Sequence, residues 1–166
     1  MPEQIPVTIV NHLGVDIEVL PDTVWQTILD EYVEAKKFRE IARIEPLDDP
    51  SAVLGGYRMR LEREGVVDER VIRFTERDEA ARRLSIFADY LTAPAGGMRV
   101  WVTYQAQEIP GGTRFTIDCH TRVGIDTPAS GAKADVAAVV AGMKLNFDTA
   151  LSAYLEQVKV KLEGAE

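Results

Sequence analysis

The last thirty-odd residues constrain the fold more than any other stretch of the chain. From Asp135 onward there is no proline, and after Gly142 there is no glycine until Gly164. Apolar residues recur at spacings of three and four, which at about 100° per residue places them on one face of a helix: Val136, Val139, Val140, Met143, Phe147, Ala150, Leu151, Tyr154, Val158 and Leu162. A helix over about 135–162 would be roughly 40 Å long. Its apolar face needs a surface of similar length opposite, and we expect a sheet there.

The segments upstream have the pattern of strands joined by short turns. Residues 9–20 alternate between apolar and polar side chains, which predicts a half-buried strand. Two short helices are expected next, one opening at 21–23 and the other over 34–42. A short strand over 43–47 follows, and then hairpin turns join five longer strands: 57–64, 67–75, 83–91, 98–109 and 113–123.

This order predicts an α+β fold in a single domain over residues 1–166. A curved antiparallel sheet of about seven strands would wrap around the long C-terminal helix, because so large a sheet twists too strongly to stay flat. The two short helices after the first strand would close one end. A cavity between sheet and helix is the ligand site that such an architecture offers.

The net charge and the cysteine content limit the classes of partner that the protein is expected to bind. The chain has 166 residues, a formal net charge of −8 and one cysteine, Cys119. The acidic balance argues against nucleic acid and against docking on anionic lipid, and it leaves a neutral or apolar small molecule as the expected partner. A single cysteine excludes an intrachain disulfide and a thiolate metal cluster. We expect no metal and no cofactor.

The location of the protein can also be predicted. Residues 1–13 lack the basic flank and the apolar run of a signal peptide. The longest apolar run, around 136–143, is far too short to span a bilayer, so no membrane insertion is expected. These features predict a cytoplasmic protein. A homodimer is compatible with the sequence.

Three segments resemble the START-like, helix-grip superfamily, also called SRPBCC. They are the strand-to-helix junction at 17–25, the strand start Glu69-Arg70-Val71-Ile72 and the C-terminal amphipathic helix. Within the superfamily the chain is most similar, over about residues 9–162, to the bacterial polyketide cyclase/dehydrase and lipid-transport family. The resemblance implies a cavity that binds a hydrophobic or amphipathic small molecule. It also implies that a minority of such proteins catalyse cyclisation or dehydration there.

Two short motifs resemble the plant abscisic acid receptors, which are distant members of the same superfamily. Glu69-Arg70 matches the pair that contains their pocket glutamate, and Lys144-Leu145-Asn146 matches the run that contains their helix asparagine. The match implies that Glu69 and Asn146 face the ligand. The gate loops of those receptors have no counterpart in this chain.

Glu69 is the first candidate site residue and the candidate acid or base. If Val67, Glu69 and Val71 share the apolar face, a carboxylate lies in an apolar cavity, where it can orient a ligand hydroxyl or move a proton. The opposite register turns Ile72 and Phe74 inward and leaves Glu69 in solvent, since a slip of one residue exchanges the faces. The inward register is preferred.

Alternation on the neighbouring strands supplies further candidates. It turns Cys119 and Thr121 inward and His120 outward, and it turns Tyr104 inward. On 83–91 the set with Leu84 is preferred inward over the set with Asp89. The predicted ligand-binding residues, which include three from the helix, are Glu69, Tyr104, Thr121, Asn146, Met143 and Phe147.

The leading functional hypothesis is binding of a lipid, polyketide or aromatic metabolite in the cavity. The alternative is an enzyme of the polyketide cyclase/dehydrase type that uses Glu69 as an interior acid or base. A third hypothesis is a protein-binding module that uses the exterior of the sheet. His12 and His120 are both expected to face outward, which argues against a histidine-based zinc site or a Ser-His-Asp triad.

Overall fold

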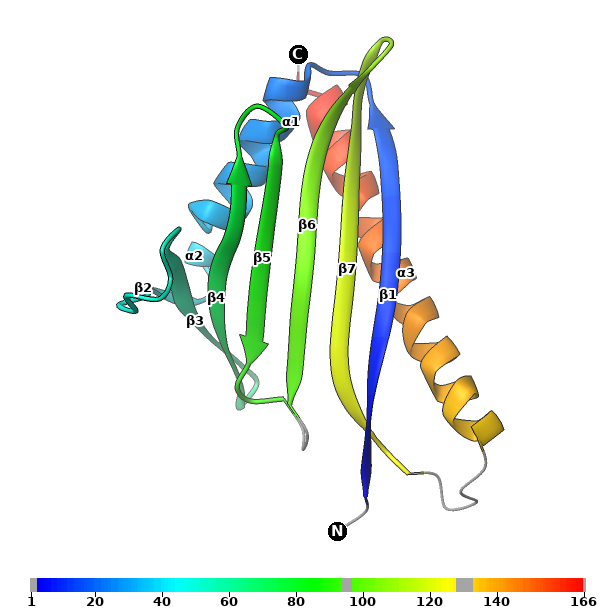
Figure 1. Ribbon diagram of the computed structural model, residues 1–166. Coiled ribbons are helices and arrows are strands. Elements are labelled where there is room, and N and C mark those ends of the chain that lie inside the picture. The colour runs from blue at the N-terminus through cyan, green and yellow to red at the C-terminus, as the bar shows by residue number, and fades with distance from the viewer. Residues whose placement is uncertain (1–2, 94–96, 128–132, 166) are drawn as a thin grey trace.

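The computed structural model describes residues 3–93, 97–127 and 133–165. The elements in chain order are β1 (Gln4–Ile17), α1 (Pro21–Ile28), the π-helical segment η1 (Leu29–Val33), α2 (Lys36–Arg39), β2 (Arg43–Pro46), β3 (Gly56–Arg63), β4 (Val66–Asp78), β5 (Arg83–Tyr90), β6 (Met98–Ile109), β7 (Gly112–Asp126) and α3 (Lys133–Glu163). The predicted element order and α+β class are confirmed (Figure 1). The first strand begins and ends earlier than expected, and η1 and the short α2 replace the second predicted helix.

The strands form one antiparallel sheet with the order β1-β7-β6-β5-β4-β3-β2. Consecutive strands from β2 to β7 are hairpin neighbours, while β1 pairs with β7 along its whole length. The sheet curves, and α1, α2 and α3 all lie on the same face of it (Figure 1). The side chains of that inner face therefore alternate with those of an outer face that no helix covers.

The core lies between the inner face and the helices. Phe115 and Ile117 of β7 and Val24 and Ile28 of α1 are fully buried. This burial explains the alternation in the strands and the apolar stripe of the first helix, because each apolar side chain removed from water favours the folded state.

Helix α3 is buried most deeply in its C-terminal half. On its apolar stripe Leu155 and Val158 are buried, whereas Val136, Val140 and Met143 are only partly buried and Val139 is 45% exposed. The helix itself was predicted correctly, but the expected apolar surface opposite its whole length is wrong. The sheet ends at β1, and the N-terminal half of α3 runs past that edge (Figure 1).

A buried polar contact marks the place where α3 meets β1. Asn11, which is fully buried, donates through Nδ2 to the Lys144 carbonyl (3.2 Å) and to Oδ1 of Asp148 (2.7 Å). Lys144 and Asp148 are themselves linked, with Nζ 3.0 Å from Oδ2. A buried amide is stable only when it is hydrogen-bonded, so this contact fixes the position of α3 along β1.

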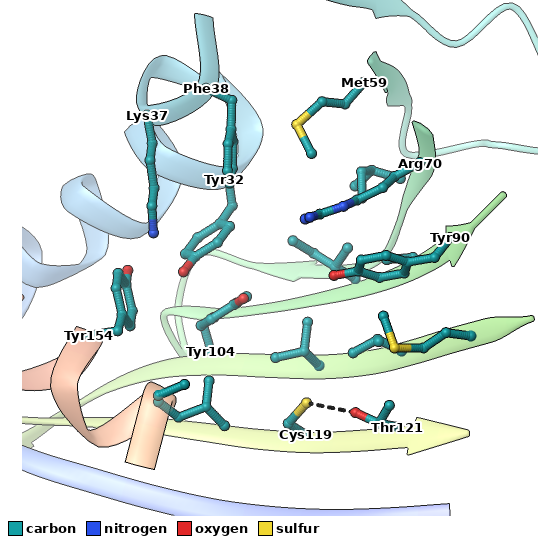
Figure 2. Close-up of a pocket in the computed structure, with 18 of the residues that line it drawn as sticks. Tyr32, Lys37, Phe38, Met59, Arg70, Tyr90, Tyr104, Cys119, Thr121 and Tyr154 are labelled. Carbon is teal, nitrogen blue, oxygen red and sulfur yellow. Dashed lines mark hydrogen bonds between the residues drawn. The ribbon is translucent and has the colours of Figure 1, made fainter. Parts of the chain in front are cut away.

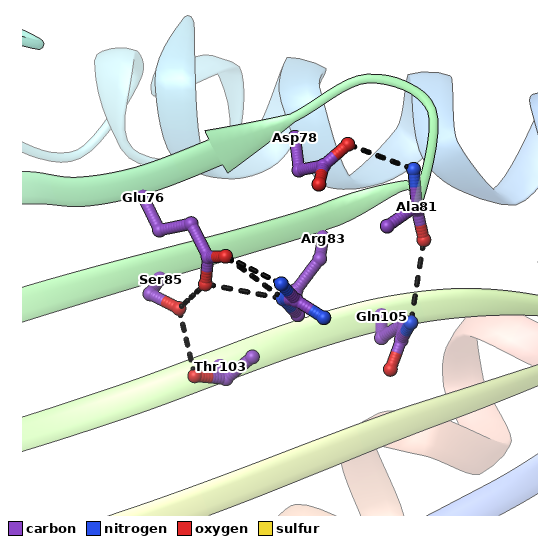
Figure 3. A network of polar contacts seen from close by, with 7 residues as sticks. All are labelled: Glu76, Asp78, Ala81, Arg83, Ser85, Thr103 and Gln105. Carbon is purple, nitrogen blue, oxygen red and sulfur yellow. Dashed lines mark hydrogen bonds and ion pairs between the residues drawn. The ribbon is translucent and has the colours of Figure 1, made fainter.

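A polar network lies on the outer face of the β4–β5 hairpin (Figure 3). A bulge at Thr75 shifts the register of β4, so that Glu76 is paired with Ser85. Arg83 donates to Glu76 from Nη2 (2.6 Å) and Nε (3.1 Å), and the Ser85 hydroxyl donates to Glu76 Oε2 (3.0 Å). Ser85 also contacts Thr103 of β6 at 2.8 Å, which ties three strands together.

This network should give the protein a measurable dependence of stability on acid pH. Hydrogen bonds from Arg83 and then Ser85 lower the pKa of Glu76 below its ordinary value of 4.5. Its stabilisation is therefore complete above pH 4.5 and is lost as the pH falls through the lower pKa of the folded state. Urea unfolding should show Glu76→Gln less stable than the wild type by up to about 1 kcal/mol at pH 7. The difference should shrink below pH 4.5, with Glu62→Gln as the exposed control. A difference that stays constant into acid would contradict this origin.

A candidate ligand pocket

A cavity of about 340 Å³ lies between the inner face of the sheet and the helices. This volume is in the range of small-molecule sites in proteins, roughly 300–1,000 Å³. Most of its wall is apolar and comes from five neighbouring strands and from α3. Beside the polar groups described below, the lining residues are Phe38, Tyr57, Met59, Ile72, Ile86, Ala88, Tyr90, Met98, Val100, Val102, Cys119, Phe147, Ala150 and Leu151.

Three tyrosines from three elements meet at one end of the pocket. Tyr32 of η1 stacks on Tyr104 of β6 with ring centroids 4.0 Å apart, and Tyr154 of α3 meets Tyr32 edge to face at 6.4 Å. Figure 2 shows the hydroxyl group of Tyr32 pointing into the space between those of Tyr104 and Tyr154. The π-helical turn of η1 turns Tyr32 out of the α-helical periodicity and places it over the sheet.

The hydroxyl groups of the three tyrosines are protonated at neutral pH. Burial raises the pKa of Tyr32 and of Tyr104 well above the ordinary value of 10, and it also raises the pKa of Tyr154. Tyr154 donates its hydroxyl proton to Oε2 of Glu31. At neutral pH these three groups are neutral hydroxyls that are hydrogen-bonded to one another, so a ligand oxygen accepts a hydrogen bond from the cluster by replacing one of these internal bonds.

Lys37 lies at the mouth of the pocket beside this cluster. Ala35, buried and with φ of 52°, separates η1 from α2, and α2 then carries Lys37 and Phe38 over the cavity. Although Lys37 as a residue is exposed, its amine packs against an aromatic face, with Nζ 4.2 Å from the ring centroid of Tyr154. Burial lowers the pKa of the Lys37 amine, and the Glu31 carboxylate acts in the opposite direction.

Arg70 of β4 is the second cation that lines the pocket. Its Nε donates to both oxygens of Asp68 (2.9 and 3.1 Å), and its Nη2 donates to Oδ2 of Asp68. The guanidinium group lies over the ring of Tyr90, 4.3 Å from the centroid (Figure 2). Among the described residues no acceptor is bonded to Nη1, which leaves a charged donor for an oxygen of a ligand.

The predicted inward register of Glu69 is wrong. Its carboxylate lies on the outer face of the sheet, 3.3 Å from Arg58 Nη1 and 3.9 Å from Arg60 Nη1, and the residue does not line the pocket. The reason is the pairing of β4 with β3, which sets Arg70 opposite Met59 on the inner face. The alternative register, with Ile72 inward, is the one that the structure has.

Three of the other predicted site residues line the pocket, and two do not. Tyr104, Thr121 and Phe147 contribute to its wall, and the hydroxyl of Thr121 lies 3.7 Å from the Cys119 sulfur. Asn146 is exposed on α3, and Met143, although partly buried, lies outside the lining. Both belong to the half of the helix that runs past the sheet.

The remaining register predictions can also be compared with the structure. Leu84 is buried on the inner face of β5, as preferred, while Asp89 is turned away from the pocket with Oδ1 3.8 Å from Arg99 Nε. His12 and His120 both lie on the outer face, at 3.9 and 3.4 Å from the Asp118 carboxylate. Within the described part of the chain, no group of His, Cys, Asp and Glu side chains is arranged to hold a metal ion.

Solved structures similar to this one share its architecture at low sequence identity. The protein Mll3558 from Rhizobium loti has a TM-score of 0.61 and 15% identity, over 92% of this chain and 98% of its own. The Zhui aromatase/cyclase from Streptomyces sp. R1128 has a TM-score of 0.57 and 17% identity, over 94% and 96%. Ara h 8.0201 has a TM-score of 0.57 and 12% identity, over 91% and 99%. No protein-family model and no curated protein matches the sequence.

The chain therefore has the helix-grip fold, as the sequence resemblance predicted. Polyketide aromatase/cyclases are among its structural neighbours. None of the helices, over the residues that the structure describes, is long and apolar enough to cross a membrane.

Proposed function

We propose that the protein binds a hydrophobic small molecule that carries oxygen acceptors, such as a fatty acid, a polyketide or an aromatic carboxylate. The observation that supports this most is the composition of the pocket wall. It is mostly apolar, and its two charged donors lie at its two ends, Arg70 at one end and Lys37 beside the tyrosine cluster at the other. Such a wall favours apolar surface along the ligand and carbonyl or carboxylate oxygens at its ends.

The absence of a carboxylate from the described pocket wall supports the same choice of ligand. Asp68 is occupied by Arg70, and Glu31 accepts a hydrogen bond from Tyr154 outside the lining. Ligands with several hydroxyl donors would find few acceptors here. The cyclase/dehydrase hypothesis, which relied on Glu69 as an interior acid or base, loses that residue. A cytoplasmic location and a homodimer stay predictions from the sequence.

The test is a substitution that fills the pocket with a large side chain from the middle of its wall. Val100 of β6 lines the cavity, and its neighbour Arg99 is exposed on the outer face of the same strand. We expect Val100→Trp to abolish binding of 1-anilinonaphthalene-8-sulfonate, an aromatic anion, and its displacement by a fatty acid, because the indole ring would fill the cavity.

Arg99→Trp is the matched control, since it places the same side chain on the same strand and disrupts only a surface ion pair with Asp89. It should bind as the wild type does. Both variants should unfold cooperatively in urea, which excludes dye binding to a loosened core. Equal binding by the Val100→Trp variant would contradict the proposal.

A further inference from the structure

We infer that Lys37 is a nucleophilic amine that captures a carbonyl group of the bound ligand as a reversible imine. The inference rests on the proposed function, because the ligand must first enter the pocket. It adds a covalent step and a ligand class, hydrophobic aldehydes and ketones.

The surroundings of the Lys37 amine carry the inference. Within the described part of the chain, Nζ has no carboxylate within ion-pair distance, and Glu31, the acidic group that acts on it, accepts a hydrogen bond from Tyr154. The ring contacts of Nζ, Tyr154 at 4.2 Å and Phe38 at 5.7 Å, attract the ammonium form. Partial burial of the amine where it lines the pocket acts in the opposite direction and favours the neutral form that attacks carbonyl carbon. The lowered pKa of this amine agrees with the geometry.

The neighbouring lysine shows what an ordinary position on α2 looks like. Lys36 is 61% exposed at its side chain, and its Nζ lies 2.8 Å from Asp30 Oδ2. It faces away from the cavity and does not line it. The two lysines therefore lie on the same helix and have side chains of the same length, but the surroundings of their amines differ.

The tyrosine hydroxyls complete the site. Figure 2 shows the Lys37 amine pointing toward the same part of the pocket as the hydroxyl groups of Tyr32 and Tyr154. Tyr154 donates its proton to Glu31, so a carbonyl oxygen placed there accepts a hydrogen bond from Tyr32 in place of Tyr154, which polarises the carbonyl bond toward attack.

The step balances without any further reactant. The neutral amine of Lys37 forms a bond from nitrogen to the carbonyl carbon, and the carbonyl oxygen takes up a proton from the nitrogen. The carbon–oxygen bond of this carbinolamine then breaks as the nitrogen lone pair forms the carbon–nitrogen double bond. The oxygen leaves as water with both amine protons, and hydrolysis reverses the sequence.

The experiment uses the full chain with 4-phenylbenzaldehyde as the probe and sodium borohydride as the trap. Borohydride reduces the imine to a secondary amine, so the protein gains the mass of the aldehyde less its oxygen. Peptide mapping then locates the label. We expect at least about tenfold more label on Lys37 than on Lys36, because binding holds the aldehyde next to the amine.

Two variants and a second ligand separate the outcomes. Lys37→Arg keeps the charge over the Tyr154 ring but cannot form an imine, and it should lose the enriched label, whereas Lys36→Arg should keep it. Binding of 4-phenylbenzyl alcohol, measured by dye displacement, should be unchanged in Lys36→Arg, whose side chain lies outside the pocket lining. If the alcohol binds but the label is spread evenly over the lysines, the inference of an imine at Lys37 is overturned. The proposal that the pocket binds a ligand is then unaffected. Failure of both the alcohol and the aldehyde to bind would overturn the proposed function as well.

Discussion

An Arg70→Met variant should bind a fatty acid or an aromatic carboxylate roughly ten- to a hundredfold more weakly than the wild type. The reason is the loss of the charged donor Nη1 from the pocket wall, since a hydrogen bond to a charged group contributes about 1.5–3 kcal/mol. Methionine keeps much of the apolar contact that the arginine stem makes. Isothermal titration with a carboxylate and with the matching alcohol measures the effect, and the affinity for the alcohol should not change.

The control for this variant lies on the same strand. Arg73 is turned to the outer face, with Nη2 3.2 Å from Asp49 Oδ2, so Arg73→Met removes an equal charge without touching the pocket. Its affinity for the carboxylate should equal that of the wild type. If Arg70→Met and Arg73→Met weaken binding equally, the effect is one of net charge, and Arg70 is not the anion contact.

Leu155→Ala should lower the free energy of unfolding by about 2–5 kcal/mol. Leu155 is 2% exposed and packs in the core under the C-terminal half of α3, so truncation leaves a cavity that the sheet cannot close. Urea unfolding followed by tryptophan fluorescence gives the change, because Trp25 lies in the same core.

Leu145→Ala is the matched substitution on the same helix. Leu145 is 66% exposed, and its truncation should change the free energy of unfolding by no more than about 0.5 kcal/mol. Similar losses in the two variants would mean that Leu145 is packed in solution. That result would contradict the exposed position of Leu145 beyond the edge of the sheet.

Much of the fold follows from simple periodic patterns in the sequence. The strands from β3 to β7 and helix α3 are predicted within a few residues, because alternation and the three-and-four spacing report which side chains are buried. The sequence does not report how far the sheet extends opposite a helix. The stripe of α3 continues through Val136 and Val139, although Val136 is only partly buried and Val139 is exposed.

The wrong register predicted for Glu69 shows that the sequence of one strand alone does not determine which of its faces points inward. The residues of β4 are compatible with either register, but the turn before the strand decides between them. Glu64 and Gly65 both have positive φ and form a two-residue hairpin turn, so Arg63 pairs with Val66 and, by counting back, Met59 pairs with Arg70. Counting from the turn would have placed Arg70 on the apolar face.

Lys37 and Tyr32 could not be found by periodicity. They lie where the helix after β1 changes to a π-helical turn and then breaks at Ala35, so neither the period of 3.6 nor that of 2 applies. Tyr154 was assigned to the apolar stripe correctly, but its hydroxyl gains a role only when η1 brings Tyr32 and Glu31 against it.

The contact of Asn11 with α3 divides this helix into two parts, one before Lys144 and one after Asp148. The residues beyond Asp148 include the buried Leu155 and Val158, while the turns before Lys144 carry no fully buried side chain among the described residues. Substitutions of exposed residues in the first part are therefore expected to change the free energy of unfolding little, whereas substitutions of buried residues in the second part lower it strongly. Sequence change can accumulate in one part of the helix without loss of the fold that the other part holds.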